Sequence, residues 1–206
     1  MNNLHTHTYI DANILTDLKK LLLAKRTDST IDYAFAFRQI AGFQRIRYKI
    51  PTFYANRNIR FPVQLSIEQC SSESTALYKS SMCEGELFVD LTGGFGVDFA
   101  FISPNFKKAI YVERNEELCD IAKHNFVELG LHHAEIACID SVHFIETLPM
   151  CDCVLVDPAR RDKAGSKMVL IEDCEPNIAD VYKPILQKTK MLLVKFSPML
   201  DISLAI

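Results

Sequence analysis

Carboxylate side chains end several of the short apolar runs in this chain. Asp90 and Glu113 close two such runs, 23 positions apart, and Asp140 and Asp157 follow two later runs. Apolar runs separated by helical stretches are typical of a parallel sheet, whose strands all present their carboxyl ends at one edge. We therefore expect the four carboxylates to line a single ligand-binding cleft.

A glycine-rich turn follows the first of these acids. The stretch reads Asp90-Leu91-Thr92-Gly93-Gly94-Phe95-Gly96-Val97-Asp98, and glycine in such a turn lets the backbone approach a ligand closely. A dinucleotide fingerprint would need glycine at Phe99, so NAD, and with it a dehydrogenase, is disfavoured. The candidate cofactor contacts in this turn are Asp90, Thr92, Gly93, Gly94, Gly96 and Asp98.

The next two acids suit the nucleoside half of a ligand. Glu113 is placed to accept hydrogen bonds from both hydroxyls of a ribose, and Asp140 could accept one from an adenine amino group. They indicate an adenosine-containing cofactor, with Arg114 and Ser141 as further candidate contacts. An Asp-Ser pair after a strand is also a common helix N-cap, and the two roles are compatible.

The fourth run leads into Asp157-Pro158-Ala159-Arg160-Arg161. This stretch would place an acid, a rigid turn and two guanidinium groups beside the expected cleft. A proline turn with solvated arginines is the alternative interpretation. We predict Asp157, Pro158 and Arg160 as catalytic residues, and Arg161, Lys195 and Ser197 as substrate-binding residues.

Five strands and the helices between them must position these residues. Short apolar runs predict strands over 87–91, 109–113, 134–139, 153–157 and 191–196. Helical spacing predicts helices over 97–103, 116–129 and 176–188. Strands that alternate with helices imply an α/β fold, with a parallel sheet covered by helices on both faces.

The first part of the chain has a different pattern. Apolar residues from Ile10 to Leu22 recur at helical spacing and predict a helix, and a second helix is expected over 30–46. Gln69, Ser72 and Glu73 could form a lid over a cofactor or a helix N-cap. We place a boundary near residue 84, giving a small helical N-terminal domain over 1–83 and a core domain over 84–206.

The composition is that of an ordinary globular protein. The 206 residues are 49% hydrophobic and 24% charged, with a formal net charge of −3. These values exclude disordered and collagen-like classes and leave any nucleic-acid contact to a local basic surface. Neither the cysteines nor the histidines show metal-ligand spacing, so we expect no metal. The lack of a signal segment or a membrane-length apolar run predicts a soluble cytoplasmic protein without membrane contact.

Residues 33–67 supply a local basic surface. They include six basic and eight aromatic side chains but no acidic one. Cations neutralise phosphates and aromatic rings stack on unpaired bases, so single-stranded or looped RNA is a candidate partner. An equally good interpretation is that the aromatic side chains pack a helical core while the arginines are solvated on the opposite face.

The motifs from Asp90-Leu-Thr-Gly-Gly-Phe-Gly through Glu113 and Asp140 to Asp157-Pro-Ala-Arg resemble a class I S-adenosylmethionine-dependent methyltransferase, over residues 86–206. The resemblance implies a Rossmann-like core with S-adenosyl-L-methionine as cofactor. In that family the glycine turn would accommodate the methionine part, Glu113 the ribose and Asp140 the adenine. Asp157 would face the methyl acceptor.

A closer resemblance is to a bacterial methyltransferase family that carries a C-terminal THUMP-like domain. It rests on Phe35-Ala-Phe-Arg-Gln-Ile-Ala-Gly42, on Leu65-Ser-Ile-Glu-Gln-Cys-Ser-Ser-Glu73 with Thr75-Ala76 and Tyr78-Lys79, and on Asp157-Pro-Ala-Arg-Arg-Asp162. Members have a small helical N-terminal part and a tail whose name suggests RNA handling. Only ten residues follow the fifth predicted strand, where class I cores usually add a helix and a strand hairpin. We therefore expect a truncated core without that hairpin or the tail, with its fifth strand at a sheet edge.

The predicted function is S-adenosylmethionine-dependent methylation, with RNA as the expected acceptor. The expected truncation leaves a cofactor-binding or RNA-binding module without transfer activity as an alternative, beside a small-molecule methyltransferase. Phe196-Ser197-Pro198 lacks the cysteine that RNA 5-methyluridine methyltransferases use after the fifth strand. Arg160 stands where amino-methylating enzymes usually place an aromatic residue, so the acceptor atom stays open.

Overall fold

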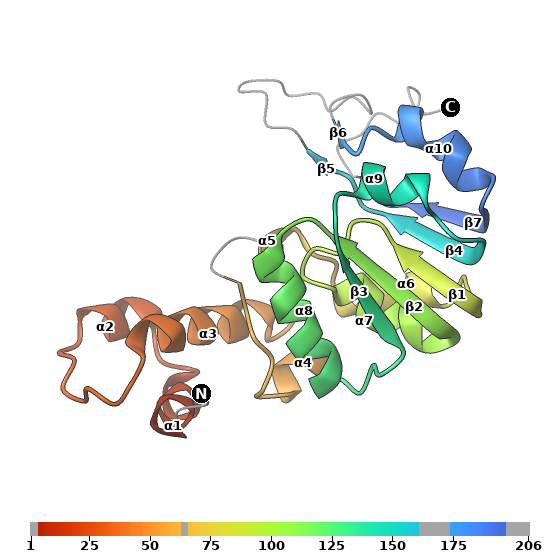
Figure 1. Cartoon of the computed structure of the whole chain (residues 1–206). Coiled ribbons are helices and arrows are strands. Elements are labelled where there is room, and N and C mark those ends of the chain that lie inside the picture. Colours follow the sequence, from red (N-terminus) through yellow and green to blue (C-terminus); the bar gives the residue numbers. More distant parts are fainter. Residues whose placement is uncertain (1–3, 63–65, 161–173, 197–206) are drawn as a thin grey trace.

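A five-stranded parallel sheet forms the part of the molecule that follows the N-terminal helices (Figure 1). The computed structural model describes residues 4–62, 66–160 and 174–196. The strands lie in the order β3-β2-β1-β4-β7, and every neighbouring pair is parallel. Their bounds are β1 Gly85–Asp90, β2 Phe106–Glu113, β3 Ala134–Cys138, β4 Cys151–Val156 and β7 Thr189–Val194. All five predicted strands are confirmed, and β7 lies at an edge of the sheet in the described part of the chain.

Alternating residues of each strand pack against helices on opposite faces. Phe88 and Tyr111 belong to one hydrophobic cluster, whereas their neighbours Val89 and Val112 belong to the other. The first cluster includes side chains from α6, α7 and α8, and the second includes side chains from α9 and α10. Helices therefore cover both faces, as predicted. These helices are α6 Glu73–Ser80, α7 Val97–Ile102, α8 Glu116–Glu128, α9 Ser141–Glu146 and α10 Ile178–Leu186, with a 3-10 turn, η1, over Ser103–Asn105.

The predicted ends of the elements are shifted by up to three residues. A shift of three residues occurs at β2, which begins at Phe106 rather than at residue 109. The exposed Lys107 and Lys108 interrupt the apolar run there, because their side chains reach solvent near the start of the strand. A short antiparallel pair, β5 Ala159–Arg160 and β6 Cys174–Glu175, follows the core strand β4.

The N-terminal part is helical, as predicted, but its first helix is interrupted. The apolar pattern from Ile10 to Leu22 predicts one helix, whereas the structure has two, α1 Leu4–Asn13 and α2 Leu18–Leu23. Asp17 caps α2 by accepting a hydrogen bond from the Lys19 N–H at 2.8 Å, which favours a new helix start there. The remaining helices are α3 Tyr33–Ile46, α4 Pro51–Ala55 and α5 Ser66–Gln69. No helix of the described residues has the length and apolar character needed to cross a bilayer.

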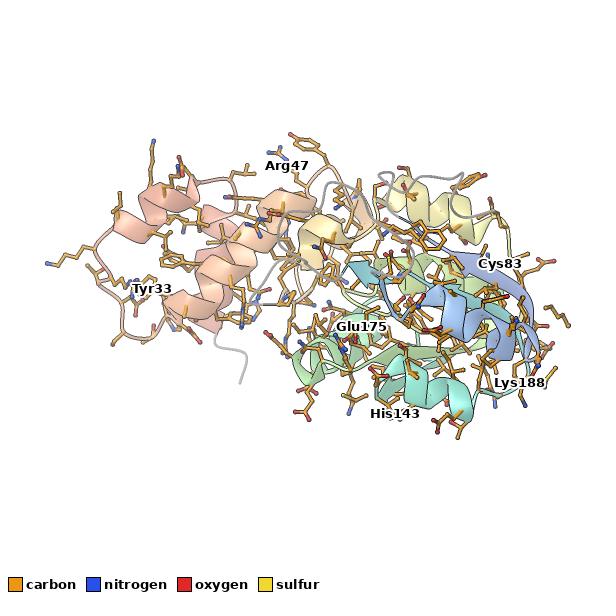
Figure 2. The ribbon with its side chains drawn as sticks, turned by 90° about the horizontal axis from the view of Figure 1, so that it is seen from above. Tyr33, Arg47, Cys83, His143, Glu175 and Lys188 are labelled. Carbon is orange, nitrogen blue, oxygen red and sulfur yellow. The ribbon has the colours of Figure 1, made fainter. Side chains whose placement is uncertain are left out.

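The N-terminal helices and the sheet share a hydrophobic core. Phe61 lies 5.6 Å from Phe95, measured between ring centroids, and Phe53 lies 5.7 Å from the same ring. The Arg60 N–H also donates to Asn125 Oδ1 on α8 at 2.8 Å. Figure 2 shows that the helices around Tyr33 and Arg47 extend to one side of the part that holds Cys83, Glu175 and Lys188. Phe95 stands in the loop after β1, so this packing connects the helical part to that loop.

Candidate active site

A cleft of about 710 Å³ opens at the carboxyl ends of the sheet strands. Its volume is within the usual range for ligand pockets, and it lies where strand order reverses between β1 and β4, the expected ligand position in such sheets. Among the predicted site residues, those that line it are Asp90, Thr92, Gly93, Gly94, Gly96, Asp98, Glu113, Arg114, Asp140, Ser141, Asp157, Pro158 and Lys195. Arg160 contributes backbone to β5, where it pairs with Cys174. Arg161 and Ser197 lie outside the described residues.

The glycine turn is held close to β2. A Cβ on Gly93 would lie 2.1 Å from the Tyr111 ring, so only glycine fits there. Gly94 and Gly96 have φ angles of 54° and 80°, which favour glycine. The Tyr111 hydroxyl donates to the Gly94 carbonyl at 2.5 Å. The loop between β1 and α7 is therefore fixed against Tyr111, with room for a ligand beside its backbone.

Glu113 fixes the turn from its other side. Its Oε2 accepts a hydrogen bond from the Gly94 N–H at 3.0 Å, and its Oε1 accepts one from the Asn115 N–H at 2.9 Å. Each carboxylate oxygen can accept further hydrogen bonds. The half-buried Glu113 side chain can therefore order the loop and still accept hydrogen bonds from ligand hydroxyls.

Asp140 is the N-cap of α9, one of the two roles expected for it from the sequence. Its Oδ1 accepts a hydrogen bond from the Val142 N–H at 2.9 Å, at the start of α9. Its Oδ2 lies 3.8 Å from Arg114 Nη1, which also donates to Glu175 Oε1 at 2.8 Å. Because Asp140 also lines the cleft, capping and ligand binding remain compatible.

Asp90 is the most deeply buried acid of the site, with 2% of its surface exposed. Burial raises its pKa to about 8, and the nearby charges of Asp98 and Asp157 act in the same direction. The Thr92 N–H opposes this rise by donating to Asp90 Oδ1 at 3.0 Å. The pKa of Asp90, about 8, therefore leaves this side chain mostly protonated at neutral pH.

Asp157 and Lys195 form an ion pair at the ends of β4 and β7. Lys195 Nζ lies 2.5 Å from Asp157 Oδ2, and the Asp157 N–H donates to the Thr92 hydroxyl oxygen at 2.6 Å. Burial raises the pKa of Asp157, an effect that Lys195 opposes. The loops after β1 and β4 and the end of β7 thus converge on one partly buried carboxylate.

Asp98 lines the cleft, but its carboxylate already has protein partners. Lys79 Nζ lies 2.5 Å from Asp98 Oδ1, and the Ser71 hydroxyl donates to Asp98 Oδ2 at 2.7 Å. Lys79 and Ser71 were not among the predicted site residues. The available signal was the position of Lys79, three residues after the buried Ala76 on the same helix face.

Gln69, Ser72 and Glu73, predicted to form a lid or a helix cap, have different roles in the structure. Ser72 caps α6 by accepting a hydrogen bond from the Thr75 N–H at 3.2 Å, and Glu73 accepts hydrogen bonds from Thr52. Gln69 lines the cleft. Within the described ranges, no group of three or more potential metal ligands is present.

The comparison with known proteins rests on solved structures, since no family model and no curated protein matches the chain. A "putative methyltransferase" from Porphyromonas gingivalis W83 superposes with a TM-score of 0.81 and is 29% identical. The alignment covers 98% of this chain and 51% of that one, so this chain spans about half the length of its structural relative. This chain has the Rossmann-like methyltransferase fold.

Two more distant structures also carry methyltransferase names. An S-adenosylmethionine-dependent methyltransferase from Agrobacterium tumefaciens is 20% identical at a TM-score of 0.46, over 68% of this chain and 50% of that one. An rRNA methylase from Streptococcus thermophilus is 13% identical at a TM-score of 0.43, over 65% and 74% of the two chains. At such scores these two likenesses carry no weight for the function of this chain.

Proposed function

We propose that this chain is an S-adenosylmethionine-dependent methyltransferase whose acceptor is RNA. The observation that carries the proposal is the cleft at the switch point of the sheet, which combines a glycine turn, two acids suited to a nucleoside and a paired acid suited to an acceptor. The fold shared with the P. gingivalis protein supports the same activity.

The side chains of the cleft fit S-adenosylmethionine. The turn leaves open space beside Gly94, where an added Cβ would meet only the Thr92 carbonyl oxygen, at 3.8 Å. Glu113 retains acceptor capacity for ribose hydroxyls, and Asp140 retains it for an adenine amino group. The cleft is rich in carboxylates, which favours a cofactor that carries positive charge on its sulfur and its amino group.

The cofactor would supply a methyl group bonded to a positively charged sulfur. The chain would position the acceptor and accept its proton. Lys195 engages Oδ2 of Asp157, which leaves Oδ1 to hold the reacting group of the acceptor. Burial makes Asp157 more basic and limits access of water, so this carboxylate is suited to take the proton that the acceptor loses. We assign positioning of the Asp157 backbone to Thr92.

The case for RNA rests on the basic segment 33–67. Four of its aromatic side chains are buried and cannot stack on bases, namely Phe37, Phe43, Phe53 and Phe61. Tyr48 is 83% exposed, with the guanidinium of Arg47 5.1 Å from its ring centroid. Packing of the core thus accounts for some of the aromatic residues in this segment. Exposed side chains such as Arg47 and Tyr48 are left to contact a polyanionic partner.

Substitution of Asp157 tests the assignment. In an assay of methyl transfer from labelled S-adenosylmethionine to total RNA, Asp157→Ala should lower the rate by at least about 100-fold, the usual scale for a lost proton acceptor. Its affinity for S-adenosylhomocysteine should stay within about twofold. Asp120→Ala, on the exposed face of α8, is the matched control and should keep the full rate. Unchanged transfer by Asp157→Ala, or equal loss of binding and transfer, would refute the role.

A further inference from the structure

A second cavity, of about 330 Å³, lies between α3 and the segment around α5. Phe35, Arg38, Gly42 and Arg45 line it from one face of α3, at spacings of three or four residues, and Pro62 and Ile67 line its other side. The opposite face of α3 is buried in the hydrophobic core, through residues such as Ile40 and Phe43. The helix therefore presents a separate, partly charged face to this cavity, which we call the α3 pocket.

The two arginines of the α3 pocket are only loosely engaged. Arg38 Nη1 lies 3.7 Å from Glu117 Oε1, and Arg45 Nη2 lies 3.6 Å from Glu68 Oε1. Both distances exceed a normal hydrogen bond, and a guanidinium carries five donor hydrogens. In addition, Nε of Arg38 is buried and has no hydrogen-bond partner among the described residues. The partly exposed guanidinium groups of Arg38 and Arg45 therefore keep donor hydrogens for an external acceptor.

An aromatic ring lies beside these cations. The Arg38 guanidinium is 5.4 Å from the ring centroid of the half-buried Phe35. Asp32 is the acidic residue among those that line the pocket, and its Oδ1 already accepts a hydrogen bond from the Phe35 N–H at 3.0 Å. Two cations and an apolar ring suit a ligand that combines a phosphate with a flat base.

The α3 pocket adjoins the active-site cleft. Glu68, which faces Arg45, itself lines the cleft, and Glu117, which faces Arg38, precedes the cleft-lining Leu118. Helix α5 therefore separates the two cavities, because its Ile67 lines the α3 pocket and its Glu68 lines the cleft. A polymer with one unit in the cleft could place a neighbouring unit in the pocket.

We propose that the α3 pocket binds a nucleotide that flanks the methylated position of a single-stranded RNA. Arg38 and Arg45 bind its phosphate, and Phe35 packs against its base. This site rests on the proposed function, and it adds a positioning role for the N-terminal helices. Recognition of a flanking nucleotide makes the chain select an RNA strand over a free nucleoside.

Binding of fluorescein-labelled decauridylate, followed by fluorescence anisotropy with S-adenosylhomocysteine present, tests the proposal. Arg38→Gln and Arg45→Gln should each weaken binding at least about fivefold, and each should reduce the salt slope by about 0.7 for one lost phosphate contact. Phe35→Leu should weaken binding by at least about fivefold with an unchanged slope, because base stacking is lost. Arg26→Gln, an exposed arginine outside the pocket, is the matched control and should bind like the unsubstituted chain. Only variants with an unchanged melting temperature are compared.

Several results would overturn the pocket assignment. One is binding by the Arg38 and Arg45 variants that equals binding by the unsubstituted chain. Another is an equal loss in Arg26→Gln, which would indicate general charge attraction. A third is that the chain binds polyglutamate through the same arginines but does not bind decauridylate, which would indicate an acidic protein partner. If the chain binds S-adenosylhomocysteine but no RNA, the pocket assignment fails while the cofactor assignment stands.

Discussion

Substitution of Gly93 tests the role of the turn after β1, and substitution of Gly130, which lies after α8, is its control. An added Cβ at Gly93 would overlap the Tyr111 ring, whereas Gly130, with a φ of 74°, has nothing within 4 Å of that position. Gly93→Ala should therefore destabilise the fold by roughly 1–3 kcal/mol through overpacking and should abolish cofactor binding. Thermal unfolding and calorimetric titration with S-adenosylhomocysteine measure the two effects.

Gly130→Ala separates local backbone strain from damage to the site. It should lower stability by about 1 kcal/mol and leave cofactor affinity intact, since Gly130 follows α8 and does not line the cleft. Equal loss of binding in the two variants would contradict the role given to the Gly93 turn.

The buried Asp90 should make the folding stability of the protein depend on pH. Its pKa is about 8 in the folded chain and about 3.9 in an unfolded one, so between these values the unfolded state releases a proton that the folded state retains. Folding stability should therefore fall as pH rises from about 4 to 8, by up to about 1.4 kcal/mol per pH unit from this group, and then level off. Asp90→Asn should lack this contribution.

Urea unfolding of both proteins at a series of pH values measures the difference. Asn keeps an oxygen for the Thr92 N–H, so the comparison isolates the charge. A stability difference that stays constant between pH 5 and pH 8 would contradict the raised pKa of Asp90.

The acids of the site were predictable from the sequence, but their supporting residues were not. Asp90, Glu113, Asp140 and Asp157 each follow an apolar run, and the edge of a parallel sheet brings such positions together. Tyr111 lies inside a strand, where periodicity predicts burial but not contact with the turn at Gly93 and Gly94. Such a contact depends on strand order, which local pattern does not specify.

At the scale of elements, the ion pair between Lys79 and Asp98 joins α6 to α7. Their side chains are only 9% and 10% exposed. Lys79→Met should destabilise the protein by about 3–5 kcal/mol, because it leaves the carboxylate of Asp98 buried without its cation. Equilibrium unfolding in urea measures the loss.

A double variant distinguishes the ion pair from simple packing. Lys79→Met with Asp98→Leu removes both buried charges and should recover most of the lost stability. If the double variant is as unstable as the sum of the two single variants, the charges are not coupled and the assignment is wrong.

Element types were predicted more accurately than element limits. Short apolar runs between helical stretches correctly predicted all five strands of the sheet, because strands buried on both faces contain few polar residues. The single helix predicted from Ile10 to Leu22 is wrong, since the Asp17 cap starts a new helix and helical spacing alone does not reveal the interruption. The helix cap at Asp17 thus determined where the helix begins, although the apolar spacing continues across it.

At the scale of the whole molecule, the shared core should make the helical part and the sheet unfold together. Phe61 is 1% exposed and contacts both Phe43 and Phe95, from α3 and from the turn after β1. Phe61→Ala should cost about 3–5 kcal/mol and lower the midpoint of a single calorimetric transition by roughly 10 °C.

The exposed Leu23→Ala, at 88% exposure, is the control and should change stability by less than about 0.5 kcal/mol. Two separate transitions, of which Phe61→Ala shifts only one, would show that the helical part folds independently of the sheet.

Calorimetric titration with S-adenosylmethionine and S-adenosylhomocysteine tests the central claim most directly, with NAD as competitor and Glu113→Gln and Glu116→Gln as paired variants. Glu116 lies exposed at the start of α8, outside the cleft. The cleft predicts binding of both ligands at one site, at least about tenfold weaker in Glu113→Gln, unchanged in Glu116→Gln and insensitive to NAD. Absence of binding for both ligands, or their displacement by NAD, would contradict the assignment of this cleft to S-adenosylmethionine.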